Sequence, residues 1–66
     1  MKKETEIMDC ICRCFDPPKD TPFLKEAVYE WSAIIDGKCV YGENGYIWYA
    51  GEIEFYQHFQ ILKGKR

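Results

Sequence analysis

The stretch VYEWSAIIDGKCVYGENGYIWYA, residues 28–50, decides the fold because it places two turn signals between apolar segments. Asp36-Gly37 and Asn44-Gly45 are dipeptides typical of turns that need a positive φ, and such turns join antiparallel strands. The residues around them are rich in aromatic and β-branched side chains, which favour a pleated sheet. We therefore predict a three-stranded antiparallel meander over about residues 27–50.

The first part of this region has a second interpretation. Residues 22–35 also fit a helix, because Thr21 is a good N-cap and Pro22 suits the first helical position. We favour the strand for residues 27–35, because the turn signal at Asp36-Gly37 then has a role as a hairpin turn. The side chains that would share the face of the alternative helix are Leu24, Val28, Trp31 and Ile35.

Residues 52–63 are equally ambiguous. As a helix, the segment has Glu52 and Glu54 in its first turn, Lys63 in its last turn and Gly64 just beyond, in agreement with the helix macrodipole. We favour this helix over the strand interpretation. In a strand, the apolar residues on one side would be Ile53, Phe55, Phe59 and Ile61.

The N-terminal part contains three cysteines at alternate positions in DCICRCF, residues 9–15. Alternation is the period of a strand, so we predict a strand over about residues 6–15. Because both of its faces are apolar, this strand should be central in the sheet or covered by a partner. Met8, Cys10, Cys12 and Cys14 would face the core, and Ile7, Ile11 and Phe15 the opposite side.

The cysteines are also the candidate metal ligands. If the chain bound zinc, the ligands would be Cys10, Cys12, Cys14 and Cys39. Successive thiols on one strand face are ~6.6 Å apart, whereas structural zinc sites usually gather their ligands from paired C-x₂₋₄-C turns. We therefore predict free, structural cysteines with no metal and no cofactor. A disulfide to Cys39 would require an oxidising compartment.

The predicted fold class is a small, single-domain, β-rich α+β protein: an antiparallel β-meander with an N-terminal strand and a C-terminal helix. The alternative is an all-β small barrel of SH3-like or OB-like type, if the tail is a strand. Residues 1–66 form one domain. Within it, we expect a flexible N-terminus at 1–5, a Pro-rich loop at 16–22 (DPPKDTP) and a basic tail at 64–66.

Charge and hydropathy narrow the class of partner. The net charge of −2, from nine basic and eleven acidic residues, makes nucleic acid an unfavourable partner, because its phosphates require basic residues. No apolar run approaches the ~20 residues of a membrane span. The N-terminus lacks the apolar stretch of a signal peptide. We therefore expect a cytoplasmic protein with no membrane partner.

Catalytic motifs are missing from the sequence. His58 is the single histidine, and no Ser-His-Asp arrangement can be built around it. The segment GENG, residues 42–45, has neither the length nor the Lys-Ser/Thr ending of a phosphate-binding loop. We therefore expect that the protein is not an enzyme.

The aromatic residues give the positive indication of function. Seven of the eleven aromatic residues lie within residues 41–59. In a strand, Tyr46 and Trp48 would face one side and Ile47 and Tyr49 the other, and one core can bury only one set. Tyr and Trp are common anchors of protein interfaces.

We therefore predict a non-catalytic protein-binding module, a small adaptor or inhibitor, which binds through an aromatic surface with an acidic rim. An inhibitor encoded by a phage or another mobile element is one form that such a module takes. The partner is another protein, a second copy in a homodimer, or both. A small zinc-binding or single-stranded nucleic-acid-binding domain is the alternative. The predicted partner-binding residues are Glu43, Tyr46, Trp48, Tyr49, Glu52 and Tyr56.

Overall fold

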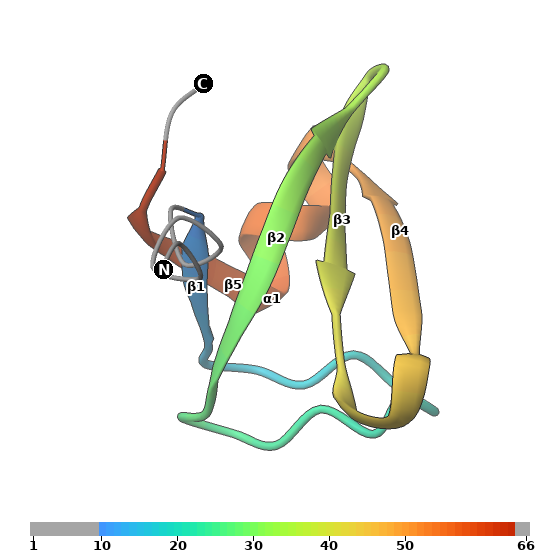
Figure 1. Cartoon of the computed structure of the whole chain (residues 1–66), viewed down its shortest axis with the longest axis vertical. Helices are drawn as coiled ribbons and strands as arrows, with labels where there is room; N and C mark the ends of the chain where they lie inside the picture. The colour runs from blue at the N-terminus through green and yellow to red at the C-terminus, as the bar shows by residue number, and fades with distance from the viewer. Residues whose placement is uncertain (1–9, 65–66) are drawn as a thin grey trace, which may run out of the picture.

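The computed structural model describes residues 10–64, which form a five-stranded antiparallel sheet and one short helix (Figure 1). The strand order is β4-β3-β2-β1-β5, so the last strand in sequence lies beside the first. The small, β-rich class is confirmed. The elements are β1 (Ile11–Cys14), β2 (Val28–Ile34), β3 (Gly37–Tyr41), β4 (Ile47–Gly51), α1 (Glu52–His58) and β5 (Phe59–Lys63).

Strands β2, β3 and β4 confirm the predicted meander. The first turn is shifted by one residue from the expected position, because Ile34 pairs with Gly37 and the turn residues are Ile35 and Asp36. Asp36 takes the positive φ of 66°. Gly37 lies in β3, where a Cβ atom would stand only 2.0 Å from the carbonyl oxygen of Ala50. The glycine is therefore needed for the close approach of β4 to β3.

The second turn takes the positive φ angles that its sequence predicts. Asn44 has a φ of 58° and Gly45 a φ of 80°, within a short 3₁₀ turn, η2 (Glu43–Gly45). The N–H of Gly42 donates to the carbonyl of Tyr46 at 2.7 Å, which closes the loop. The Asn-Gly pair thus supplies the left-handed backbone that this turn requires.

The tail is a helix followed by a strand. The predicted C-terminal helix is confirmed over Glu52–His58 and is wrong beyond it, because β5 starts at Phe59. Lys63 and Gly64 therefore do not end the helix. The physical reason is the edge of β1 that faces away from β2. Pairing with β5 gives the backbone N–H and C=O groups of this edge hydrogen-bond partners, which a longer helix would not provide.

Residues 15–27, between β1 and β2, form neither helix nor strand. The alternative helix that starts at Thr21 is wrong, because the Thr21 hydroxyl donates to the Pro18 carbonyl at 2.7 Å and regular structure resumes only at Val28. The segment still contributes to the core through Phe23, which is buried. Prolines at the start of the segment and two residues with positive φ, Asp20 and Glu26, favour this irregular path.

Strand β1 is central, between β2 and β5, as the sequence predicts. Cys12 and Cys14 are fully buried and Cys10 is half-buried, in agreement with the predicted inward face. The described strand covers Ile11–Cys14. Cys10 and Phe15, which the prediction included, flank the strand without belonging to it, and residues 6–9 of the prediction lie outside the described residues.

The core lies between the sheet and α1, which is drawn behind β2 in Figure 1. It is mainly aromatic: the rings of Phe55 and Phe59 stack with centroids 5.6 Å apart, and Phe23 packs edge-on against Phe59 at 5.2 Å. Large rings allow a short chain to remove much apolar surface from water. The core residues are Cys12, Cys14, Phe23, Trp31, Val40, Ala50, Phe55 and Phe59.

Candidate interaction surface

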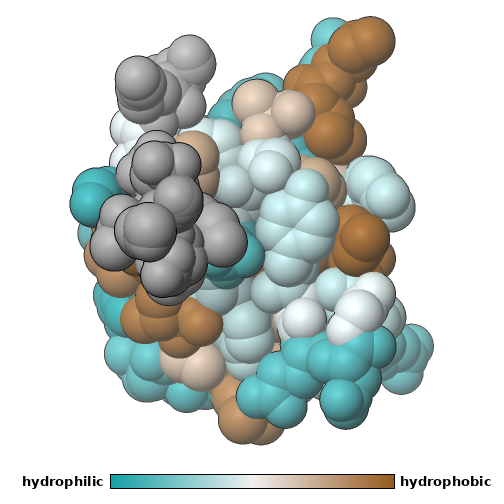
Figure 2. All heavy atoms as spheres, viewed as in Figure 1, coloured by the Kyte–Doolittle hydropathy of each residue, from teal (hydrophilic) through white to brown (hydrophobic). Residues whose placement is uncertain are grey.

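The register of the meander separates its side chains into two faces. Val40 pairs with Trp31 on β2 and with Trp48 on β4, and these three side chains face the core. Because side chains alternate along a strand, the intervening residues point to the opposite side. We call this opposite side of β2, β3 and β4 the outer face. It faces the viewer in Figure 2, where strongly apolar patches border a paler, weakly hydrophilic area.

The outer face exposes large apolar and aromatic side chains in adjacent positions. Tyr49 is 64% exposed, Ile47 40%, Ile34 38% and Tyr41 37%. Tyr41 pairs directly with Ile47 across β3 and β4, and Tyr49 is two residues from Ile47 on the same strand. Opposite residues in such a pair have Cβ atoms ~5 Å apart. Tyr41, Ile47 and Tyr49 therefore form one cluster, whereas Ile34 lies at the turn end of β2, opposite Gly37.

A polar network orders the middle of this surface. Cys39 is only 4% exposed although it lies on the outer face. Its thiol is 3.5 Å from the Tyr41 hydroxyl, which donates to the Ser32 hydroxyl at 3.1 Å. The hydrogen bond to Ser32 lowers the pKa of Tyr41, but Cys39, burial and Tyr49 together raise this pKa above its ordinary value. The phenol of Tyr41 is therefore neutral and fixed in place.

Acidic residues lie around the outer face. Glu30, on β2, pairs with Tyr41 on β3. Glu43 is the first residue of η2, before β4, and Glu52 is the first residue of α1, directly after it. Glu54 is two residues further, in the same helical turn. Strand β4 itself contains no charged residue, so it is an apolar strand with acidic groups at both ends.

The predicted partner-binding residues do not all lie together. Tyr46 and Trp48 are half-buried and pack against the core, whereas Tyr49 is exposed on the outer face. Tyr56 lies on α1, on the core side of the sheet. Sequence reasoning missed the outer-face residues Ile34, Tyr41 and Ile47. The alternation of β4 pointed to Ile47, but only the register shows that Tyr41 lies beside it.

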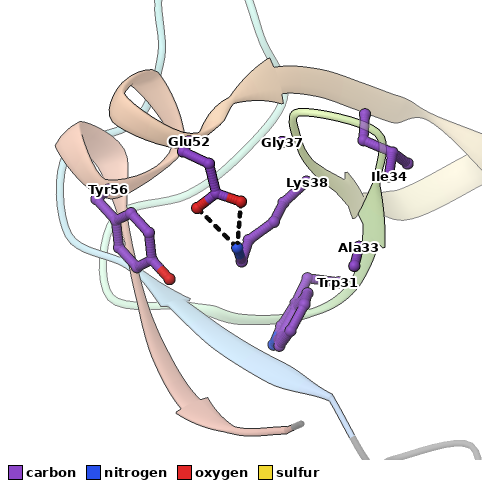
Figure 3. A pocket seen from close by; sticks show the side chains of 7 residues that line it. All are labelled: Trp31, Ala33, Ile34, Gly37, Lys38, Glu52 and Tyr56. Atoms are coloured by element: carbon purple, nitrogen blue, oxygen red, sulfur yellow. Dashed lines mark hydrogen bonds and ion pairs between the residues drawn. The ribbon is translucent and has the colours of Figure 1, made fainter. Parts of the chain in front are cut away.

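A second feature is a pocket of ≈ 330 Å³ at the end of the sheet, beside α1 (Figure 3). Its most unusual residue is Lys38, a lysine that is only 6% exposed. The Nζ atom of Lys38 lies 2.9 Å from each carboxylate oxygen of Glu52. The pocket is lined by Trp31, Ala33, Ile34, Gly37, Lys38, Glu52 and Tyr56.

The Lys38 ammonium is also surrounded by aromatic rings. Its Nζ atom is 5.4 Å from the ring centroid of Trp31, 5.6 Å from that of Phe55 and 5.2 Å from that of Tyr56. Rings at this distance stabilise a cation through their quadrupoles. The paired carboxylate and the rings together replace the water that the buried ammonium has lost. Lys38 and Glu52 therefore connect β3 to the start of α1.

The cysteines do not converge on one point. Cys12 and Cys14 face the core from β1, while Cys39 lies on the outer face of β3. Across residues 10–64 no group of three or more His, Cys, Asp or Glu side chains is arranged to hold a metal ion. Burial, followed by the effect of Cys14, raises the pKa of Cys12 to about 12, and burial raises the pKa of Cys14 as well. These thiols are therefore protonated at neutral pH, which makes them weak nucleophiles.

His58 has a structural environment. Its Nδ1 atom lies 2.7 Å from the backbone carbonyl oxygen of Asp16, and its ring meets Trp48 edge-on with centroids 5.8 Å apart. Since a carbonyl only accepts hydrogen bonds, Nδ1 carries the proton in this contact. His58 thus connects the end of α1 to the loop that follows β1.

None of the helices in residues 10–64 has the length and apolarity needed to cross a lipid bilayer. Comparison with known proteins gives no relative from which the role of the surface or the pocket could be inferred. No protein-family model matches the chain, and neither the curated proteins nor the solved structures give a significant match.

Proposed function

We propose that this protein is a non-catalytic protein-binding module, acting as a small adaptor or inhibitor, and that its outer face is the contact surface. One observation carries the proposal: Tyr41, Ile47 and Tyr49 expose apolar and aromatic side chains in adjacent positions of the sheet. Contiguous apolar surface of this kind marks sites that a partner covers.

The chemistry of the surface suits a protein partner. Tyrosine buries a large ring and keeps a hydroxyl that can pair at the interface, which is why it anchors many contacts. The Tyr41 hydroxyl is already held by Ser32, so little side-chain freedom is lost there on binding. The acidic groups around the face favour a partner with basic residues at its margin.

The connectivity supports a small, open SH3-like barrel as the scaffold. Strand β2 pairs with β1 through Val28–Glu30 and with β3 through Glu30–Ile34, so its two halves belong to different parts of the sheet. Strand β5 returns to β1 after α1, which places the last strand beside the first. A sheet that bends at a shared strand encloses a core with few residues, and its outer surface remains free for binding.

The test compares a double variant of the outer face with a single variant of α1. Ile47→Ala with Tyr49→Ala removes the exposed side chains of β4, whereas Ile53→Ala removes a 78% exposed side chain from α1. Binding partners are captured from an extract of the native host, and sedimentation equilibrium of the purified protein measures self-association. We expect the β4 double variant to lose the partner or the dimer while Ile53→Ala retains it. Equal binding by both variants would contradict the assignment of the outer face.

A further inference from the structure

The position of β4 in the sheet leaves one of its edges open. Among residues 10–64, β4 pairs with β3 alone. The Gly42 N–H donates to the Tyr46 carbonyl, so the backbone groups of Tyr46 point toward β3. Along a strand, the backbone groups of successive residues point to alternate sides, so this hydrogen bond determines which residues of β4 face the open edge. With Tyr46 directed toward β3, the N–H and C=O groups of Ile47 and Tyr49 point toward the open edge. Within residues 10–64, the backbone hydrogen bonds outside the strand ladders do not involve either residue.

The edge of β4 also lacks the usual protection against strand pairing. Its sequence, IWYAG, has no charged residue and no proline, and its register with β3 is regular from Ile47 to Gly51. Edge strands in other proteins commonly carry charges, prolines or bulges that prevent association. The opposite edge, β5, has Lys63, and its pairing with β1 contains a register shift. The two edges of this sheet therefore differ in kind.

We infer that β4 receives an extended segment of another protein as a sixth strand of the sheet. This inference rests on the proposed function and specifies its mode of recognition, in which main-chain hydrogen bonds provide affinity and alternate side chains provide specificity. Ile47 and Tyr49 are the residues whose amides point to the edge, and their side chains lie on the outer face. A segment paired with β4 therefore extends the outer face by one strand.

Charge complementarity selects the occupant. Glu43 lies before β4 and Glu54 lies shortly after it, so both ends of the edge are acidic, whereas the charge of Glu52 is paired with Lys38. A second copy paired antiparallel would place Glu43 of each chain near Glu54 of the other. A second copy paired in parallel would place Glu43 beside Glu43 and Glu54 beside Glu54. Both arrangements oppose like charges, so the segment belongs to a different protein, with apolar residues at alternate positions and Lys or Arg at each end.

The experiment uses linear peptides of random sequence, about twelve residues long, because a strand of five to six residues needs flanks that reach the acidic ends. Peptides are selected on the immobilised protein and their affinities are measured by calorimetry. The chain is then made by chemical ligation with an N-methyl group on the Tyr49 amide. This change removes the outward N–H and blocks pairing at the open edge, and it leaves the ladder to β3 intact.

We expect the selected peptides to alternate apolar residues between basic ends and to lose at least about tenfold in affinity on N-methylation, since one lost hydrogen bond and a steric block act together. Glu43→Gln should also weaken binding. Glu30→Gln removes the same charge from the same face two strands away from the edge, and it should have the smaller effect. Circular dichroism of each variant confirms that the fold is retained.

The outcomes separate this inference from the proposed function. If no sequence is enriched, strand addition is refuted, while a folded partner captured by the outer face still supports the proposed function. If the peptides bind the N-methylated chain as well as the parent but lose affinity to Tyr49→Ala, the face binds and the edge does not. If neither Tyr49→Ala nor N-methylation changes the binding of an enriched peptide, both the strand addition and the outer-face site are refuted for that peptide.

Discussion

The partly buried ion pair between Lys38 and Glu52 gives the most specific prediction about stability. Glu52→Gln keeps the size of the side chain and removes its charge, so the Lys38 ammonium stays buried among three rings without a counter-ion. Lys38→Met removes the ammonium and keeps the apolar stem, and it leaves a Glu52 side chain that is 53% exposed and able to regain water. The two substitutions remove the same pair, but they leave different charges behind.

The expected magnitude follows from the distance and the burial. Two unit charges 2.9 Å apart attract by about 1.4 kcal/mol at the dielectric constant of water and by about 6 kcal/mol at an effective value of 20. Because Glu52 is half exposed, the lower part of this range applies, and glutamine still accepts one hydrogen bond. We expect Glu52→Gln to lower the free energy of unfolding by about 2 kcal/mol, and Lys38→Met by less than about 1 kcal/mol.

Thermal unfolding measures both effects. In a domain of this size, 1 kcal/mol shifts Tm by about 4–8 °C, so Glu52→Gln should lower Tm by roughly 8–16 °C. Glu54→Gln is the matched control: it removes the same charge from the same helical turn, and within the described residues it takes part in no ion pair. The reasoning is refuted if Glu52→Gln and Glu54→Gln give the same Tm, or if Lys38→Met destabilises the fold more than Glu52→Gln does.

Three further predictions concern the scaffold. Gly37→Ala should destabilise the fold by more than about 2 kcal/mol, since its Cβ would meet the Ala50 carbonyl at 2.0 Å. Gly51→Ala, with its nearest contact at 3.8 Å, should change the free energy of unfolding by no more than about 0.5 kcal/mol. Urea unfolding measures both variants. Cys12 should react with a thiol reagent at about pH 8 only as fast as the chain unfolds; rapid modification in the folded state would contradict its burial. The pKa of Cys12 is about 12 in the folded protein and 9.0 ordinarily, so the unfolded chain loses the thiol proton first as the pH rises. The free energy of unfolding should therefore be unaffected below about pH 9 and should fall between pH 9 and about 12. Cys12→Ala should weaken this pH dependence.

The meander was predictable because its determinants are local. Asn44-Gly45 takes the positive φ angles that its residue types favour, so the turn can be recognised from two residues. Gly37 was a correct signal with a different cause, because it is required by the carbonyl of Ala50, which belongs to another strand. A contact between strands cannot be read from the turn sequence alone.

The tail and the site depended on non-local pairing. Residues 52–63 fit a helix and a strand about equally by pattern, and the position where one gives way to the other is set by the edge of β1, to which Phe59 and the residues after it pair. The outer face depended on pairing in the same way. Alternation showed that Ile47 and Tyr49 share a side, but Tyr41 joins them only through the β3–β4 register.

Strand β4 separates folding from binding by the alternation of its side chains. Trp48 and Ala50 face the core, and the fold depends on them, whereas Ile47 and Tyr49 remain exposed after the core is complete. A chain of 66 residues has little stability to lose. Exposed apolar residues that contribute nothing to its core lower its solubility without making the fold more stable. Ile47 and Tyr49 lie on β4, whose second edge is open and uncharged within residues 10–64. This coincidence favours a common explanation, in which both features belong to the surface that receives the partner.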